Sequence, residues 1–101
     1  MKSYKIYQLP VQNKATFMDY EFVKAHKVIP DFKDYNLVYE GEIEDYGAND
    51  VTLLEMIYHE LNVNHPADYT ARSLSTSDVV EINNQFYYCD AIGYVNLLNW
   101  K

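Results

Sequence analysis

The stretch "SLSTSDVVEINNQFYYCDAIGYV" (Ser73–Val95) decides the fold class of this chain, because it has the pattern of a β-hairpin. Two runs of β-forming residues, "DVVEI" and "QFYYCDA", flank Asn83–Asn84, and asparagines tolerate the positive φ angles of a tight hairpin turn. This turn places Val80 across from Tyr87. One face of the hairpin is then expected to carry the side chains of Val80, Ile82, Tyr87 and Cys89.

Five further segments complete the expected fold. Alternating, β-rich runs predict strands at residues 3–9, 35–43 and 94–98. Apolar residues at helical spacing predict helices at residues 15–27 and 52–62. The order strand, helix, strand, helix and then two or three strands is typical of an α+β domain. We expect a small antiparallel or mixed sheet of four to five strands with two helices on one face.

The helix expected at Thr52–Asn62 has the clearest pattern of the two. Thr52 and Glu55 have the spacing of a capping box, which predicts that the helix begins at Thr52. In the other helix, Thr16 is the expected cap. The apolar stripe that the longer helix is expected to turn toward the core consists of Leu54, Ile57, Tyr58 and Leu61.

The length and composition indicate one domain over residues 1–101. A chain of this size buries well over half of its surface on folding, so we expect no metal and no disulfide to be needed for stability. Cys89 is the only cysteine, which favours a reducing, cytoplasmic location. The sequence has no long apolar run and "MKSYKIYQLP" has no apolar leader region, so neither a membrane span nor a signal peptide is expected.

The charge is strongly acidic and unevenly distributed. The formal net charge is -7. Residues 1–30 carry five basic and two acidic side chains, whereas residues 31–60 carry nine acidic side chains and one lysine. Direct nucleic-acid binding is not expected, because that affinity depends on Lys and Arg at the phosphates. The acidic surface suits either simple solubility or a basic protein partner.

The sequence carries few of the patterns on which enzymes depend. His59 and His65 are six residues apart and straddle a helix end, unlike the four-residue spacing of a zinc-binding helix. Cys89 lies in a run of strand formers, where a buried structural cysteine is expected rather than a nucleophile. The chain has three glycines and no phosphate-binding glycine motif. We therefore expect no enzymatic activity, no cofactor and no metal site.

Eleven tyrosines in 101 residues favour a binding protein, since tyrosine combines a large apolar ring with a polar tip. Tyr39 and Tyr58 are expected in the core. Tyr46 and Tyr69 lie in expected loops and are better candidates for contact with a partner.

The acidic residues around the second expected strand are the candidate partner-binding site. Glu40, Glu42 and Glu44 alternate, so their carboxylates are expected to point to the same side of that strand. The alternative is a solvated edge strand whose charges discourage aggregation. The candidate site comprises Glu40, Glu42, Glu44, Asp45, Tyr46 and Asp50.

Four stretches of this chain resemble the YodL-like domain. They are "YKIYQL", "YNLVYEGEI", "LNVNHPADYTARSLSTSDVVEI" and "FYYCDAIGYVNL", and together they span nearly the whole chain. The most specific part extends from His65–Pro66 through "SLSTSDVV" to "YYCDAIGY". The resemblance supplies no catalytic residues.

The resemblance implies that proteins like this one are encoded in Gram-positive bacteria and on their conjugative elements and phages. Small acidic proteins of such elements are often inhibitors of host defence, including anti-CRISPR and antirestriction proteins. The expected function is binding and inhibition of a host defence nuclease, for example a Cas effector or its guide complex, at a basic nucleic-acid-binding surface. The alternative is a non-inhibitory protein-interaction module of a conjugative or phage complex.

Overall fold

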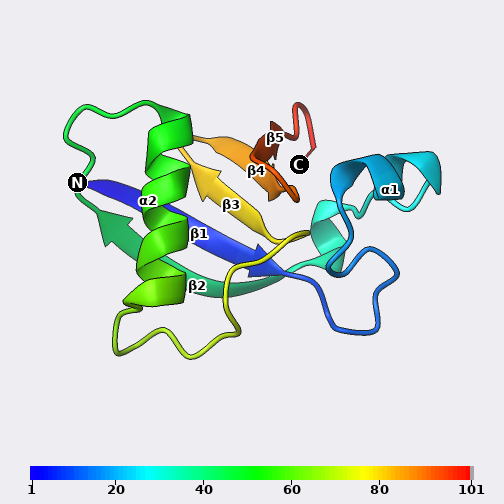
Figure 1. The fold of residues 1–101 in the computed structure, drawn as a ribbon, viewed down its shortest axis with the longest axis horizontal. Coiled ribbons are helices and arrows are strands. Elements are labelled where there is room, and N and C mark those ends of the chain that lie inside the picture. Colours follow the sequence, from blue (N-terminus) through cyan, green and yellow to red (C-terminus); the bar gives the residue numbers. More distant parts are fainter. Residues whose placement is uncertain (101) are drawn as a thin grey trace.

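The computed structural model describes residues 1–100 and contains one five-stranded antiparallel sheet with two α-helices (Figure 1). The expected α+β class is confirmed. The strands lie in the order β2-β1-β3-β4-β5. In chain order the elements are β1 (Lys2–Gln8), α1 (Tyr20–Ala25), the short 3-10 helix η1 (Phe32–Asp34), β2 (Asn36–Ile43), α2 (Asp50–Val63), β3 (Val79–Ile82), β4 (Gln85–Cys89) and β5 (Tyr94–Asn96).

The hairpin of β3 and β4 forms as the sequence predicts. Val80 lies opposite Tyr87, and the turn residues Asn83 and Asn84 have φ angles of 50° and 62°. Both angles fall in the left-handed region, which asparagine tolerates better than most residues. The four residues predicted to share one face all contact the same core cluster, namely Val80, Ile82, Tyr87 and Cys89.

Helix α2 lies across one face of the sheet and begins earlier than predicted (Figure 1). Its N-cap is Asn49, whose side-chain oxygen accepts a hydrogen bond of 2.9 Å from the backbone N–H of Thr52. The prediction that Thr52 caps the helix is therefore wrong, because Asn49 already takes that role. Tyr58 is 37% exposed and lies outside the stripe. The buried stripe consists of Leu53, Leu54, Ile57 and Leu61.

The helix predicted at 15–27 is limited to Tyr20–Ala25. Phe17 has a φ of 67°, in the left-handed region, so the right-handed helix cannot include Phe17 or extend through it to Ala15. Asp19 is the N-cap and accepts a hydrogen bond of 2.8 Å from the backbone N–H of Phe22. Thr16 instead donates its hydroxyl proton to the carbonyl of Pro10 at 2.6 Å, so the prediction that it caps this helix is wrong.

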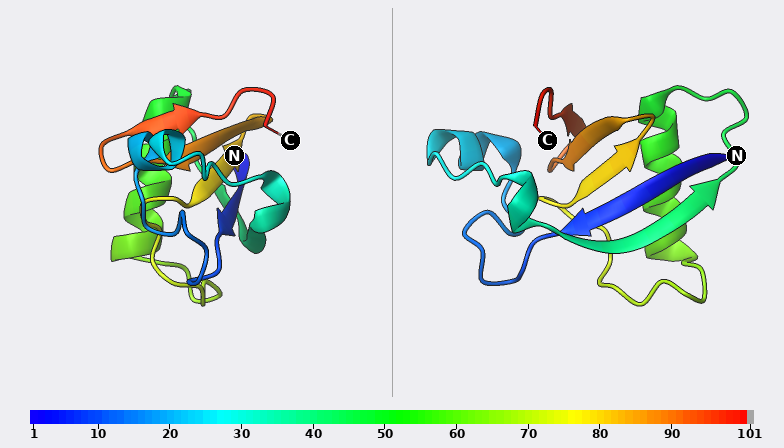
Figure 2. Two further views of the ribbon diagram at one scale, coloured as in Figure 1. Left: turned by 90° about the vertical axis from the view of Figure 1, so that its right-hand side faces the viewer. Right: turned by 180° about the vertical axis from the view of Figure 1, so that it is seen from behind.

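The core consists of two clusters on opposite faces of the sheet. Residues of β1 point alternately to the two faces. Tyr4 and Ile6 pack with α2 in the first cluster, whereas Tyr7 packs in the second cluster. Val23, the buried residue of α1, belongs to the second cluster. The two helices therefore do not share one face, since α1 lies beyond the end of the sheet and only α2 crosses it (Figures 1 and 2).

The connection between α2 and β3 is fixed by side chains rather than by regular structure. The side chain of Asn62 donates to the carbonyl of Leu74 and accepts from its N–H, both at 2.7 Å. Tyr69, expected to be a surface contact, is only 4% exposed and packs its ring against Tyr39. The expectation for Tyr69 is wrong because this connection folds back onto the core. Neither α-helix within residues 1–100 is long and apolar enough to cross a membrane.

Candidate functional site

The sheet face opposite α2 is uncovered over part of β1, β2 and β3, as the view from behind shows (Figure 2, right). In the register of these strands Lys5 lies between Glu40 on β2 and Glu81 on β3. Residues directly opposite one another in a sheet present their side chains on the same face. We call this surface the open face and define it by Ser3, Lys5, Glu40, Glu42 and Glu81, with Ser3 opposite Glu42.

The charges of the open face are held at fixed positions by the strands. The ammonium of Lys5 lies 3.9 Å from a carboxylate oxygen of Glu40. The Tyr7 hydroxyl donates a hydrogen bond of 2.7 Å to Glu81. Burial of the Tyr7 ring, together with this hydrogen bond and the charge of Glu81, raises the pKa of its hydroxyl above the ordinary value. By donating this hydrogen bond, Tyr7 orients the Glu81 carboxylate.

A shallow hollow of about 650 Å³ lies on this part of the sheet. All five residues of the open face line it, together with the turn residues Asn83 and Asn84. Three carboxylates and one ammonium give the face an excess of negative charge. Such a surface is suited to cationic side chains of a partner, which it can pair with from rigid backbone positions.

The structure brings together two of the six residues proposed from the sequence. Glu40 and Glu42 lie on the open face, whereas β2 ends at Ile43 and leaves Glu44 beyond the strand. Asp45 and Tyr46 form the following turn, in which Tyr46 is 82% exposed and has a φ of 46°. Glu44 therefore lies just outside the strand, and no pairing with β1 fixes the direction of its side chain.

Asp50, the sixth proposed residue, is occupied by contacts within the chain. Its carboxylate accepts hydrogen bonds from the Tyr87 hydroxyl at 2.5 Å and from the Asn83 amide at 2.8 Å. Burial of Tyr87 and its bond to Asp50 raise the pKa of the Tyr87 hydroxyl to about 12. Asp50 thus ties the start of α2 to the β3–β4 hairpin.

Ser3, Lys5 and Glu81 belong to the open face but not to the candidate site expected from the sequence, and Glu81 is the one carboxylate among them. The alternation of "DVVEI" places it on the face opposite Val80 and Ile82, which was the available signal. The alternation could not indicate which strands lie beside β3 in the sheet. Glu81 joins Glu40 only because β1 lies between β2 and β3 in the sheet.

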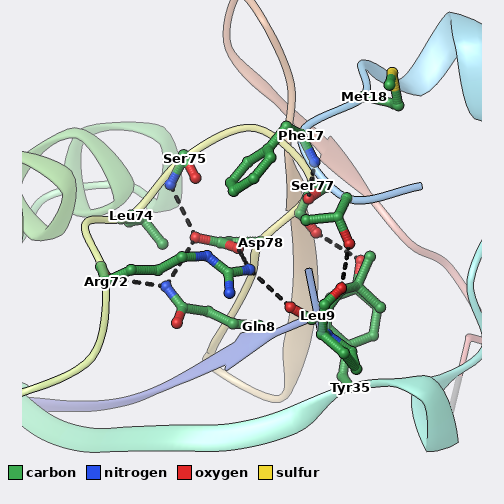
Figure 3. A network of polar contacts seen from close by, with 12 residues as sticks. Gln8, Leu9, Phe17, Met18, Tyr35, Arg72, Leu74, Ser75, Ser77 and Asp78 are labelled. Atoms are coloured by element: carbon green, nitrogen blue, oxygen red, sulfur yellow. Dashed lines mark hydrogen bonds and ion pairs between the residues drawn. The ribbon is translucent and has the colours of Figure 1, made fainter. Parts of the chain in front are cut away.

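The tract most specific to the YodL-like resemblance forms a buried polar network rather than a surface site (Figure 3). Asp78 is fully buried, and one carboxylate oxygen accepts hydrogen bonds from the backbone N–H of Ser75 at 2.8 Å and from the side-chain amide of Gln8 at 3.1 Å. A guanidinium nitrogen of Arg72 lies 3.5 Å from the other oxygen. The same nitrogen donates to the carbonyl of Leu9 at 2.8 Å.

Ser77 extends this network to the segment before α1. Its hydroxyl accepts from the backbone N–H of Phe17 at 2.9 Å, and its carbonyl accepts from the Tyr35 hydroxyl at 2.6 Å. Three segments distant in sequence are thereby joined beneath the surface (Figure 3). The Ser77 hydroxyl and the Asp78 carboxylate of "SLSTSDVV" serve the fold, and none of these contacts resembles a nucleophile activated by a base.

The remaining reactive side chains lie apart from one another. Cys89 is 1% exposed, and burial raises the pKa of its thiol, with Asp78 adding to the effect. His59 and His65 are exposed. Within residues 1–100 no three His, Cys, Asp or Glu side chains are grouped so that they could hold a metal ion.

The fold and the open face define a small α+β domain whose antiparallel sheet carries one helix on one side and fixed carboxylates on the other. A family model described as the YodL-like domain matches residues 3–100, and the chain belongs to that family. No curated protein and no solved structure gave a significant match to this chain.

Proposed function

We propose that this chain is a small acidic mobile-element protein of the anti-CRISPR type. It binds a host defence nuclease in the cytoplasm, a Cas effector or its guide complex, and inhibits it by occupying a basic nucleic-acid-binding surface. The observation that carries the proposal is the open face. There Glu40 and Glu42 on β2 and Glu81 on β3 present their carboxylates from strands that both pair with β1. The chain itself binds no nucleic acid.

The spacing of the carboxylates supports the proposal. Glu40 and Glu42 are two residues apart on one strand, so their Cα atoms are separated by about 6.6 Å. This is close to twice the rise of about 3.4 Å between successive phosphates of a DNA strand. Glu40 and Glu81 flank the same residue of β1, which places them roughly 10 Å apart at ordinary strand spacing. The face offers a sparse, two-dimensional array of negative charge to the arginines and lysines of a nucleic-acid channel.

The test compares two double variants with the same change in net charge. Glu40→Gln with Glu42→Gln removes two carboxylates of the open face. Glu21→Gln with Glu55→Gln removes two exposed carboxylates from the helices. DNA cleavage by a purified Cas effector of the host is measured with each protein at low and at physiological salt. We expect the open-face variant to inhibit less than the control variant, mainly through a slower association rate and with a weaker dependence on salt.

Equal inhibition by both variants would show that the open face is not the contact surface. A tagged form of the chain is also used to recover effectors from a host extract. If the unchanged chain inhibits none of the recovered effectors, the proposed inhibition itself is refuted.

The second candidate function is a non-inhibitory interaction module of a conjugative or phage complex. The observation that favours it is Lys5, which lies between two glutamates on the open face and has no counterpart in a phosphate backbone. A mixed-charge surface suits a partner with its own matching pattern of charges. Recovery of a structural protein of the element, together with uninhibited cleavage, would favour this function.

A further inference from the structure

Strand β2 forms one edge of the sheet and is its longest strand, with eight residues. It pairs with β1 on one side, and within residues 1–100 no backbone hydrogen bond joins it to any other segment. In an antiparallel strand every second residue directs its N–H and C=O away from the paired neighbour. The outer side of β2 therefore presents a row of unpaired backbone groups, which is the template for adding another strand.

The two edges of the sheet differ in how strongly they resist such pairing. The opposite edge, β5, has only three residues. β2 contains no proline, and the irregularity in its pairing with β1 falls between Tyr39 and Leu37, near its start. The remaining stretch, from Tyr39 to Ile43, pairs regularly with β1. Regular, extended edge strands accept a partner strand most readily.

The charges of β2 select the kind of strand that can be added. On the inner side, β1 places Lys5 directly opposite Glu40, with the charged groups 3.9 Å apart. A strand added on the outer side would place its own side chains beside Glu40 and Glu42 in the same manner. Cationic side chains at alternate positions would pair with both glutamates, whereas acidic ones would be repelled.

The same charges disfavour a second copy of this chain as the occupant. A two-fold pairing of β2 with itself, centred on Gly41, would set Glu40 of each copy against Glu42 of the other. Like charges directly opposite one another destabilise a strand pair.

The start of β2 offers an apolar contact beside the charged stretch. Leu37 is 48% exposed although it lies in the strand. A hollow of about 370 Å³ is lined by Leu37, Val38, Tyr39, Glu40 and Asp68. The hollow also contains the carboxylates of Glu40 and Asp68, so a side chain of an added strand that enters it would meet acidic as well as apolar groups.

We propose that β2 binds an extended, basic segment of a protein partner as a sixth strand of the sheet, with Lys or Arg at alternate positions facing Glu40 and Glu42. The inference rests on the proposed function in one respect, namely that the partner is a basic protein. It adds the mode of recognition, in which backbone hydrogen bonds give affinity and the alternating cations give specificity.

The experiment uses the full chain, labelled with ¹⁵N, and three capped peptides of equal length. The first alternates lysine and threonine, the second is the same sequence with every backbone nitrogen methylated, and the third has glutamate in place of lysine. We expect the first peptide to shift the amide signals of β2. At about ten times its dissociation constant it should slow the hydrogen exchange of alternate β2 amides about tenfold. The methylated peptide keeps the charges, but its methyl groups remove the backbone donors and block the close approach of a second strand, so neither it nor the glutamate peptide should have this effect.

Equal shifts from the methylated peptide would show binding by charge alone and overturn the proposal. So would shifts centred outside β2, the absence of any shift at millimolar peptide, or a dimer in light scattering that already protects β2. The Glu40→Gln, Glu42→Gln variant should lose the effect and the Glu21→Gln, Glu55→Gln variant should keep it. Because this assay contains no nuclease, peptide binding without inhibition would refute only the proposed function, and inhibition without peptide binding only this proposal.

Discussion

Replacing Asp78 by asparagine should change how the stability of this chain depends on pH. Asp78 is fully buried, and burial raises the pKa of its carboxyl from 3.8 to about 6. The hydrogen bonds from Ser75 and Gln8 and the charge of Arg72 act in the opposite direction and are smaller in effect. The raised value means that the folded state binds the Asp78 proton more tightly than the unfolded state does.

The sign and size of the effect follow from this difference. A carboxyl whose pKa is higher in the folded state stabilises that state fully below pH 3.8, and this contribution is lost as the pH rises through 6. Each pH unit between the two pKa values corresponds to about 1.36 kcal/mol, so the loss is about 3 kcal/mol. Asparagine does not titrate, and its oxygen can still accept from Ser75 and Gln8.

The measurement is urea unfolding of the unchanged chain and of Asp78→Asn at about pH 3 and about pH 7. We expect the free energy of unfolding of the unchanged chain, relative to the variant, to be about 3 kcal/mol higher at the lower pH. Glu44→Gln, which removes an exposed carboxylate with the same change in net charge, should show no such difference. If Asp78→Asn does not fold, an NMR titration of the Asp78 carboxyl carbon in the unchanged chain measures the same pKa directly.

If the difference in free energy of unfolding between the unchanged chain and Asp78→Asn is the same at both pH values, the reasoning is refuted, because Asp78 would then have an ordinary pKa. A change in the opposite direction, with the unchanged chain gaining stability as the pH rises, would show that the ion pair with Arg72 outweighs burial.

Three further predictions concern the fold. Gly41→Ala should lower the free energy of unfolding by about 1–3 kcal/mol in urea, because the new Cβ would lie 2.7 Å from the Tyr39 ring and 2.8 Å from that of the buried Tyr4; an unchanged value would show that both rings can move aside. In the same assay Asn49→Ala should lower the free energy of unfolding by about 1 kcal/mol, whereas Thr52→Ala should leave it nearly unchanged. The reverse result would show that Thr52 is the N-cap of α2. Cys89 should react with iodoacetamide only as fast as the chain unfolds, so its rate should rise with urea, and rapid alkylation of the native protein would contradict its burial.

The features that the sequence predicted correctly depend on short-range pattern. The hairpin followed from two β-rich runs around Asn83–Asn84, and three members of the α2 stripe followed from helical spacing. In each case neighbours within one turn or one strand determine the outcome.

The features that the sequence did not predict depend either on competition between nearby groups or on packing of a segment that has no regular structure. Asn49 and Thr52 are both good N-cap residues, and only the folded chain shows which oxygen meets the helix N-terminus. Residues 15–27 have apolar residues at helical spacing, yet Phe17 adopts a left-handed conformation and Thr16 bonds to Pro10 instead. Tyr69 lies in a connection without regular structure, so no periodicity could indicate its burial.

The sequence by itself determined the fold class, the acidic character and the position of Glu40 and Glu42 on one side of a strand, because charge and alternation are local properties. Only the tertiary structure decided that β1 lies between β2 and β3, which brings Glu81 onto the same face and sets Lys5 between two glutamates. It also decided that Asp50 is held by Tyr87 and that β2 is left at an edge. Strand order is a property of the whole core, since each strand takes the neighbour that buries most apolar surface, and no window of sequence contains that comparison.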